Sequence, residues 1–187
     1  MTGGKQSLRE EIRQRRAARD EHALAAHGLL LAAHAGAIPG QTLTAFVGAG
    51  GEVPTLPLLD ALVALGRRVL LPVTLADMSL DWAVYTGPAD LAAARFGLLE
   101  PTGSRLGCEA IASVDTVLAP ALAVDSLGHR LGQGGGCYDR ALLLTSAMVI
   151  AVVFDDEIIE AVPTEPHDLP VAAVLTPSGG VMPFPRG

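Results

Sequence analysis

Short apolar runs that alternate with helix-like stretches constrain the fold of this chain most strongly. Strands are expected at residues 42–47, 69–73, 80–85, 114–118, 148–154 and 171–175. Helical stretches are expected at residues 56–65, 88–95 and 138–145, with a loop at 97–101 and a helical turn at 156–162. Strands that are covered on both faces read as continuous apolar runs, and helices between them supply the cover. The sequence therefore predicts an α/β fold with a mostly parallel sheet, flanked by helices on both faces in three layers.

The first forty residues add a helical N-terminal segment. Ser7 and Glu10 have the spacing of a capping box, so a helix is expected to begin near Leu8. A second helical stretch at residues 20–35 is expected to end at Ile38-Pro39-Gly40. With 187 residues, 50% of them hydrophobic, the chain is long enough to bury a core. One domain spanning residues 1–187 is expected.

Composition and charge exclude several function classes. A formal net charge of -7 gives no overall attraction for nucleic acid or anionic lipid, and 4% aromatic residues are few for base stacking. Two cysteines cannot form a disulfide framework. The longest apolar run, residues 23–39, contains His27 and His34, which argues for a buried helix rather than a membrane span. No signal peptide is visible, so a soluble cytoplasmic protein with small-molecule partners is expected, as a monomer or weak dimer.

A glycine-rich loop at residues 128–136 carries the clearest chemical signal. Five glycines in nine residues let the backbone bend and approach a ligand closely. Successive N–H groups in such a loop, followed by a helix start, form a cradle for phosphate. Two standard phosphate motifs are absent, because no G-x-x-x-x-G-K-[ST] occurs and Cys137 stands where G-x-G-x-x-G needs glycine. An ordinary glycine-rich turn is the alternative.

Three segments taken together resemble one family. They are Lys5-Gln-Ser-Leu-Arg9, the loop from Gly128 to Arg140, and the segment from Pro163 to Asp168. In this order and spacing they are similar to the 5-formyltetrahydrofolate cyclo-ligase family, also called methenyltetrahydrofolate synthetases. Residues 48–55 and 97–101 are also similar to family segments, so the resemblance covers nearly the whole chain. The loop with its N-terminal partner is the specific part.

The resemblance implies an ATP- and Mg²⁺-dependent ligase of one-carbon metabolism. The family converts 5-formyltetrahydrofolate to 5,10-methenyltetrahydrofolate and releases ADP and phosphate. The formamide oxygen is a poor leaving group, so phosphorylation of that oxygen lets N10 close the ring and phosphate depart. The protein then acts mainly by positioning the reactants and neutralising charge.

The resemblance also implies roles for individual residues. For ATP these are Lys5, Arg9 and the loop residues Arg130, Leu131, Gly132, Gln133, Gly134, Gly135, Gly136, Cys137 and Tyr138. For folate they are Val47, Glu52 and the loop residues Gln133, Gly134, Gly135, Gly136 and Cys137. Arg130 and Tyr138 are the candidate catalytic residues, and Asp139 and Asp168 the candidate Mg²⁺ ligands. Each of these residues also has an alternative without a role in ligand binding. Lys5 and Arg9 would form a solvated basic helix face, Asp139 would be an acid at a helix start, and Glu52 would be an exposed loop acid.

Three positions depart from the family pattern. Cys137 replaces a tyrosine, Glu157 stands where glutamine is common, and Ala172 replaces a common aspartate. The departures at Cys137 and Ala172 motivate a first alternative, a family homologue that binds nucleotide or folate without turnover. A second alternative is a sugar-phosphate isomerase on a related scaffold, which leaves Lys5 and Arg9 unexplained. Lys5 is the one lysine among thirteen basic residues, and substituting Arg16, further along the same helix, is expected to change turnover little.

Overall fold

The computed structural model describes residues 2–165 and 168–185, and its centre is a seven-stranded sheet in the order β12-β11-β9-β6-β1-β2-β3. The five inner strands run parallel, and the two edge strands pair antiparallel to their neighbours. The strands are β1 (Thr42–Thr44), β2 (Arg68–Thr74), β3 (Leu80–Val84), β6 (Thr116–Pro120), β9 (Met148–Val152), β11 (Ala173–Thr176) and β12 (Gly180–Pro183). This sheet confirms the prediction of a mostly parallel α/β fold.

The two faces of the sheet are covered differently. Helices α2 (Glu21–Ala33) and α3 (Leu56–Ala64) cover the first face, where Leu31 and Leu58 pack with the strand residue Leu118. On the second face, helix α4 (Cys137–Leu142) and a 3₁₀ segment at Cys108–Ser113 pack against β2, β3 and β6 around Trp82. Loop segments close the rest of that face around Ala121 and Val171. Helical cover is thus extensive on one face and short on the other.

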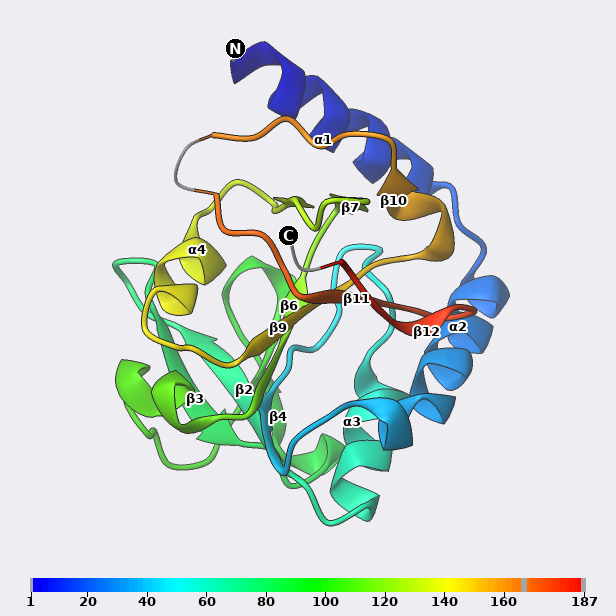
Figure 1. Ribbon diagram of the computed structural model, residues 1–187. Coiled ribbons are helices and arrows are strands. Elements are labelled where there is room, and N and C mark those ends of the chain that lie inside the picture. The colour runs from blue at the N-terminus through cyan, green and yellow to red at the C-terminus, as the bar shows by residue number, and fades with distance from the viewer. Residues whose placement is uncertain (1, 166–167, 186–187) are drawn as a thin grey trace.

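Helix α1 (Thr2–Ala17) lies outside the main sheet, over a small second sheet (Figure 1). That sheet has the order β10-β7-β8, formed by β10 (Ile158–Ile159), β7 (Ala123–Asp125) and β8 (Arg130–Leu131). Ile12 is fully buried there in a cluster with Leu122 and Leu131. Because β8 leads directly into the glycine-rich loop, this packing places the basic residues of α1 over the loop.

The apolar run at residues 23–39 forms α2 and the turn that follows it. Asp20 caps the helix, since its carboxylate accepts hydrogen bonds from the backbone N–H groups of His22 and Ala23 at 3.0 and 3.3 Å. Leu31 is buried while Leu29 remains 67% exposed, so only one side of the helix meets the sheet. Across residues 2–165 and 168–185, no helix has the length and apolar character needed to cross a bilayer.

Several local predictions are wrong. Ser7 lies inside α1 rather than at its start, because the helix begins at Thr2 and its first turns include Lys5, which contacts Asp168 and Glu165. The expected helix at 88–95 is a 3₁₀ turn followed by β4 (Leu91–Ala93), and the expected loop at 97–101 contains β5 (Leu99–Pro101). These two strands pair antiparallel, and such pairing is invisible to local pattern. The expected helical turn at 156–162 is a 3₁₀ turn at Asp155–Glu157 that leads into β10.

Candidate active site

The glycine-rich loop leaves β8 and enters α4. Gly134 and Gly136 have φ values of +99° and +70°, a region that side-chain-bearing residues rarely adopt, so glycine is required at these turns. The guanidinium of Arg9 packs against Gly134, whose Cβ, if present, would lie 3.4 Å from Arg9 Cζ. A glycine-rich backbone beside a cation is an arrangement suited to binding phosphate.

Two arginines of α1 hold this loop through its carbonyl groups. Arg9 Nε donates to the Gly132 carbonyl at 2.9 Å, and Arg13 Nη2 donates to the Gln133 carbonyl at 3.0 Å. Positions 9 and 13 are one helical turn apart, so they share one face of the helix. The structure thus brings Arg9 to the predicted phosphate loop, and it adds Arg13, which the sequence analysis missed.

Lys5 lies near the start of the same helix. Its ammonium donates to Asp168 Oδ2 at 2.7 Å and to Glu165 Oε2 at 3.3 Å. Burial acts to lower the pKa of Lys5, but the hydrogen bonds and charges of Asp168 and Glu165 outweigh it, so the pKa lies above the ordinary value of 10.5. Lys5 and Asp168, predicted for ATP and Mg²⁺, are therefore direct partners of each other. Residues 166 and 167 of the matching Pro163–Asp168 motif lie outside the described residues.

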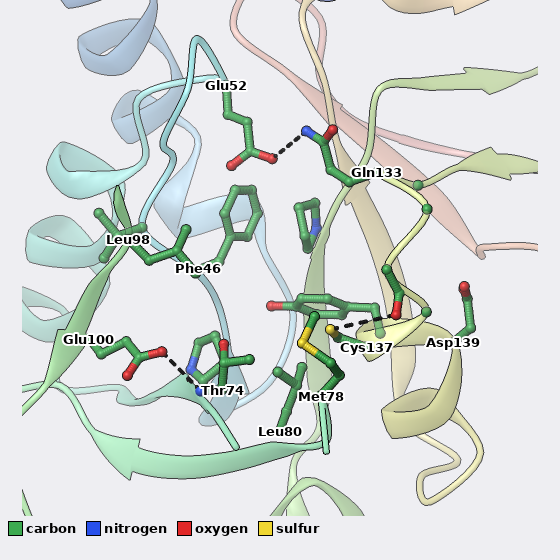
Figure 2. A pocket seen from close by; sticks show the side chains of 18 of the residues that line it. Phe46, Glu52, Thr74, Met78, Leu80, Leu98, Glu100, Gln133, Cys137 and Asp139 are labelled. Carbon is green, nitrogen blue, oxygen red and sulfur yellow. Dashed lines mark hydrogen bonds between the residues drawn. The ribbon is translucent and has the colours of Figure 1, made fainter. Parts of the chain in front are cut away.

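A cavity of about 260 Å³ opens beside the loop (Figure 2). The loop and the start of α4 form one wall, and apolar side chains from the main sheet and the β4–β5 hairpin form the rest. Its lining residues are Phe46, Val47, Glu52, Pro72, Thr74, Met78, Leu80, Leu98, Leu99, Glu100, Pro120, Arg130, Gly132, Gln133, Gly134, Gly135, Gly136, Cys137, Tyr138 and Asp139. A phosphate-binding backbone and an apolar slot thus share one cavity.

Most of the predicted site residues meet in this cavity, and four do not line it. Lys5, Arg9 and Asp168 lie outside its lining, on or beside α1. Leu131 is 1% exposed, and its side chain packs in the core beneath α1. Trp82 and Tyr85 are buried core residues and do not belong to the cavity lining.

Two carboxylates mark different ends of the cavity. Glu52 accepts hydrogen bonds from Gln133 Nε2 and from the Ala49 backbone N–H, both at 3.2 Å. Glu100 accepts from the Thr74 backbone N–H at 2.9 Å, and Figure 2 shows the ring of Phe46 between these two pairs. Burial raises the pKa of Glu52 above its ordinary value of 4.5, although both of its hydrogen bonds lower it. An acceptor held in apolar surroundings selects ligands that carry N–H groups.

Two further polar side chains in the cavity wall are buried without a full set of partners. Arg130 contacts Asp139 through Nη2, while its Nε and Nη1 are buried with no hydrogen-bond partner among the described residues. The Tyr138 hydroxyl is buried and equally unpartnered within residues 2–165 and 168–185. Burial, followed by the charge of Glu52, raises the pKa of Tyr138, so the phenol is neutral. Buried donors normally have acceptors, so these groups call for an acceptor-rich ligand.

Metal ligation is not preorganised in the described part of the chain. No group of three or more His, Cys, Asp or Glu side chains there is arranged to hold a metal ion. Asp139 lines the cavity, is 57% exposed at its side chain and is paired with Arg130, and Asp168 is bound to Lys5. A cation at Asp139 would therefore depend on oxygen ligands supplied by a bound molecule.

Arg16 has a larger role than its position in the sequence indicates. Its Nε and Nη2 donate to the two carboxylate oxygens of Glu157 at 2.8 and 2.7 Å, and Nη2 also donates to the Ala121 carbonyl. The two side chains are 2% and 1% exposed. Arg16 is thus a buried residue of the fold, and Glu157, noted as a departure, is its partner. The expected small effect of Arg16 on turnover stays a prediction.

Several lining residues had no recognisable local signal. Phe46, Met78 and Leu98 look like core residues in the sequence, and only the folded sheet and hairpin bring them to one cavity. Glu100 belongs to a segment that resembles the family, but its place in the cavity wall was not foreseen. Cys137 both lines the cavity, as predicted, and packs against the second-face core.

Comparisons with known proteins agree with this architecture. A sequence model described as the 5-formyltetrahydrofolate cyclo-ligase family matches residues 1–177. A 5-formyltetrahydrofolate cyclo-ligase from Mycolicibacterium smegmatis is 47% identical, over 78% of this chain and 78% of that protein. The enzyme of that name from Escherichia coli is 32% identical, over 74% of this chain and 79% of its own length.

Solved structures give the same result for the fold. The structure of 5,10-methenyltetrahydrofolate synthetase from Aquifex aeolicus superposes with a TM-score of 0.81 at 26% identity, covering 98% of this chain and 94% of that one. A synthetase from Mycoplasma pneumoniae, at 16% identity and a TM-score of 0.70, supports the fold alone. These matches confirm the prediction of a ligase of this class, made from the glycine loop and the Lys5–Arg9 motif. The chain belongs to the 5-formyltetrahydrofolate cyclo-ligase family.

Proposed function

We propose that this protein converts 5-formyltetrahydrofolate to 5,10-methenyltetrahydrofolate with ATP and Mg²⁺, releasing ADP and phosphate. One observation carries the proposal: the glycine loop and the apolar slot are walls of a single cavity of about 260 Å³. A triphosphate on the loop and a pteridine in the slot would meet there. Family membership weighs against the sugar-phosphate isomerase alternative. The cytoplasmic location and the monomeric or weakly dimeric state stay predictions.

The nucleotide side of the proposal is supported by charge and by unpartnered donors. Arg130 presents buried Nε and Nη1 groups that lack acceptors in the described structure, and phosphate oxygens would supply them. Arg9 and the backbone of residues 132–136 add a second cation and the N–H cradle. Lys5 reaches this group only through a rearrangement of its pairs with Asp168 and Glu165.

The folate side is supported by the shape and polarity of the slot. Phe46, Val47, Leu80 and Leu98 provide apolar walls for a flat heterocycle. Glu52 provides a held carboxylate for the N–H groups of the reduced pterin.

The proposed reaction asks the protein to position groups and to neutralise charge. The formyl oxygen attacks the γ-phosphorus, and the bond between that phosphorus and the ADP oxygen breaks. N10 then attacks the activated carbon and the ring closes. N10 gives up its proton to the departing phosphate or to water, and the carbon–oxygen bond breaks as phosphate leaves. In this scheme Arg130 stabilises charge on the transferring phosphoryl oxygens, and the neutral Tyr138 hydroxyl donates a hydrogen bond in the cavity.

A magnesium ion is compatible with the residues present. Mg²⁺ typically takes one or two carboxylates and completes its shell with phosphates and water, so Asp139 beside the loop suffices as a protein ligand. Bound there, the ion would neutralise charge on the phosphates. Asp168 joins the ligand set only if Lys5 releases it.

The role of Asp139 has a direct test. Asp139→Asn removes a ligand charge, so we expect the Mg²⁺ concentration for half-maximal turnover to rise about tenfold and kcat to fall. The fold is expected to stay intact, because the Asp139 side chain is 57% exposed. An unchanged Mg²⁺ titration would assign Asp139 to the helix start alone.

The activity itself is tested by absorbance at the band of the methenyl product. Purified protein is mixed with 5-formyltetrahydrofolate, ATP and Mg²⁺, with matched samples that lack one component each. The proposal expects product only in the complete mixture, with one ADP for each methenyl group. Binding of both ligands without product would support the non-catalytic homologue that the Cys137 and Ala172 departures suggest.

A further inference from the structure

A continuous chain of hydrogen bonds runs from α1 through the glycine loop to Glu52. Arg13 donates to the side-chain oxygen of Gln133 from Nε at 3.3 Å and from Nη2 at 3.2 Å. Gln133 Nε2 in turn donates to Glu52 Oε1 at 3.2 Å. The family motifs account for the loop and for Glu52, but they give Arg13 no role.

The chemistry of the first link fixes the orientation of the second. An arginine side chain has five N–H donors and no acceptor, so only the oxygen of the Gln133 carboxamide can face Arg13. The amide nitrogen, which only donates, then faces the carboxylate of Glu52. Without Arg13 only Glu52 orients the carboxamide, so Gln133 is restrained at one end instead of two.

Glu52 needs such an external anchor because its own backbone is permissive. It follows Gly50 and Gly51, whose φ values are +58° and +85°, so the local chain restricts its direction weakly. The Ala49 N–H binds one carboxylate oxygen, and Gln133 binds the other. The Gln133 contact is thus what ties Glu52 to the opposite wall of the cavity.

We propose that Arg13 is a positioning residue: by orienting the Gln133 carboxamide, it holds Glu52 against the cavity for the folate. The inference rests on the proposed function, because it assigns Glu52 to the folate. It links the two halves of the site through one residue, since Gln133 also contributes backbone to the phosphate loop. Arg13 touches neither ligand in this arrangement.

A purely structural role for Arg13 predicts a different result. Arg13 Nη2 also binds the Gln133 backbone carbonyl, so it could serve only to fasten the loop. That contact survives in Gln133→Met, which loses the carboxamide alone. If Arg13 acts by orienting Gln133, Arg13→Met and Gln133→Met raise the folate Kd by the same factor. The double variant then raises the folate Kd no further.

Calorimetric titration of the full-length protein with 5-formyltetrahydrofolate, and separately with ATP, measures the two affinities. We expect the folate Kd to rise about tenfold in Arg13→Met, in Gln133→Met and in the double variant, and the ATP Kd of Gln133→Met to change less than about twofold. Arg13→Lys, which keeps one donor group, should recover part of the folate affinity. Arg15→Met is the matched control, because Arg15 Nε is buried with no hydrogen-bond partner in the described residues. The proposal would be overturned if the folate Kd were unchanged in Arg13→Met, or if the folate Kd of the double variant rose nearly one hundredfold.

A second readout does not depend on any ligand. In a ¹⁵N NMR spectrum, the side-chain amide of Gln133 should be restrained in the parent and in Arg15→Met, and mobile in Arg13→Met. A mobile amide in the parent would contradict the proposal. If the parent bound no 5-formyltetrahydrofolate, the proposed function would fail, and this spectrum would still decide whether Arg13 orients Gln133.

Discussion

The middle and the last turn of α1 use the same residue type for different purposes. In the middle of the helix, Arg9 and Arg13 bind carbonyl groups of the glycine loop from partly exposed positions. Near the C-terminal end, Arg16 forms a bidentate ion pair with Glu157 that is almost wholly excluded from solvent. Figure 1 shows that one straight helix spans both regions. The degree of burial, and not the residue type, thus distinguishes Arg9 and Arg13, which contact the loop, from Arg16, which stabilises the fold.

The difference follows from what each contact costs to break. Removing one member of a buried ion pair leaves an uncompensated charge, which is strongly destabilising. Removing a partly exposed arginine leaves a carbonyl that water can reach. The last turn of α1, with Arg16, therefore serves as an anchor, and the turns before it present Arg9 and Arg13 to the loop.

The largest expected effect is on stability. In Arg16→Met the carboxylate of Glu157, whose side chain is 1% exposed, stays buried without its main partner. Its other partners in the described structure are the Phe154 N–H and the more distant Arg19. We expect the free energy of unfolding to fall by about 3–5 kcal/mol. Urea unfolding followed by circular dichroism measures it.

The double variant Arg16→Met/Glu157→Met sharpens this prediction. Because it removes both charges together, it should be more stable than Arg16→Met. A double variant that is less stable than either single variant would show that the ion pair is not the anchor.

Arg9→Met should act mainly on nucleotide use. It loses the bond to the Gly132 carbonyl and a cation beside Gly134, so we expect kcat/KM for ATP to fall about thirtyfold, about 2 kcal/mol. The free energy of unfolding should change by less than about 1 kcal/mol. Turnover at saturating folate, measured beside a urea titration, gives both quantities.

Lys5→Arg should have a smaller effect of the same kind. The ammonium sits between Asp168 Oδ2 and Glu165 Oε2 and is 13% exposed, which suits a compact charge better than a planar guanidinium. We expect kcat/KM for ATP to fall about tenfold, about 1.4 kcal/mol. The raised pKa of Lys5 means that its ion pairs persist below pH 10.5 and weaken only as pH rises through the folded-state pKa. A rate equal to that of the parent would make the lone lysine a compositional accident.

The smallest expected effect is a pH dependence at Glu52. Burial is the largest cause and raises the pKa of Glu52. The hydrogen bonds from Ala49 and Gln133 and the charge of Arg16 lower this pKa, and the charge of Glu157 raises it. The net shift is upward. The carboxylate should therefore take up a proton on acidification at a pH above the ordinary glutamate value of 4.5. KM for the folate should then rise a few-fold as pH falls through that range. Glu52→Gln, which cannot titrate, should lose this component, and an identical pH profile in both proteins would remove Glu52 from the folate site.

The sequence predicts the parts of this molecule that depend on local pattern. Apolar runs locate the inner strands, and the glycine spacing locates the loop that reaches the cavity. Long-range pairing was invisible: Arg16 and Glu157 lie 141 residues apart, and neither neighbourhood signals a buried ion pair. The β4–β5 hairpin was missed for the same reason, and with it the place of Glu100 in the cavity wall. Arg13 looked like one arginine among twelve until the fold brought it to Gln133.

The separate roles of the middle and the last turn of α1 are tested most directly by measuring Arg9→Met and Arg16→Met together. For each variant, kcat/KM for ATP is determined on the folded fraction and plotted against the free energy of unfolding. The account predicts that Arg9→Met loses turnover at nearly parental stability. It predicts that Arg16→Met loses stability while its folded fraction keeps turnover within about threefold of the parent. Parallel losses of turnover and stability in both variants would contradict the account.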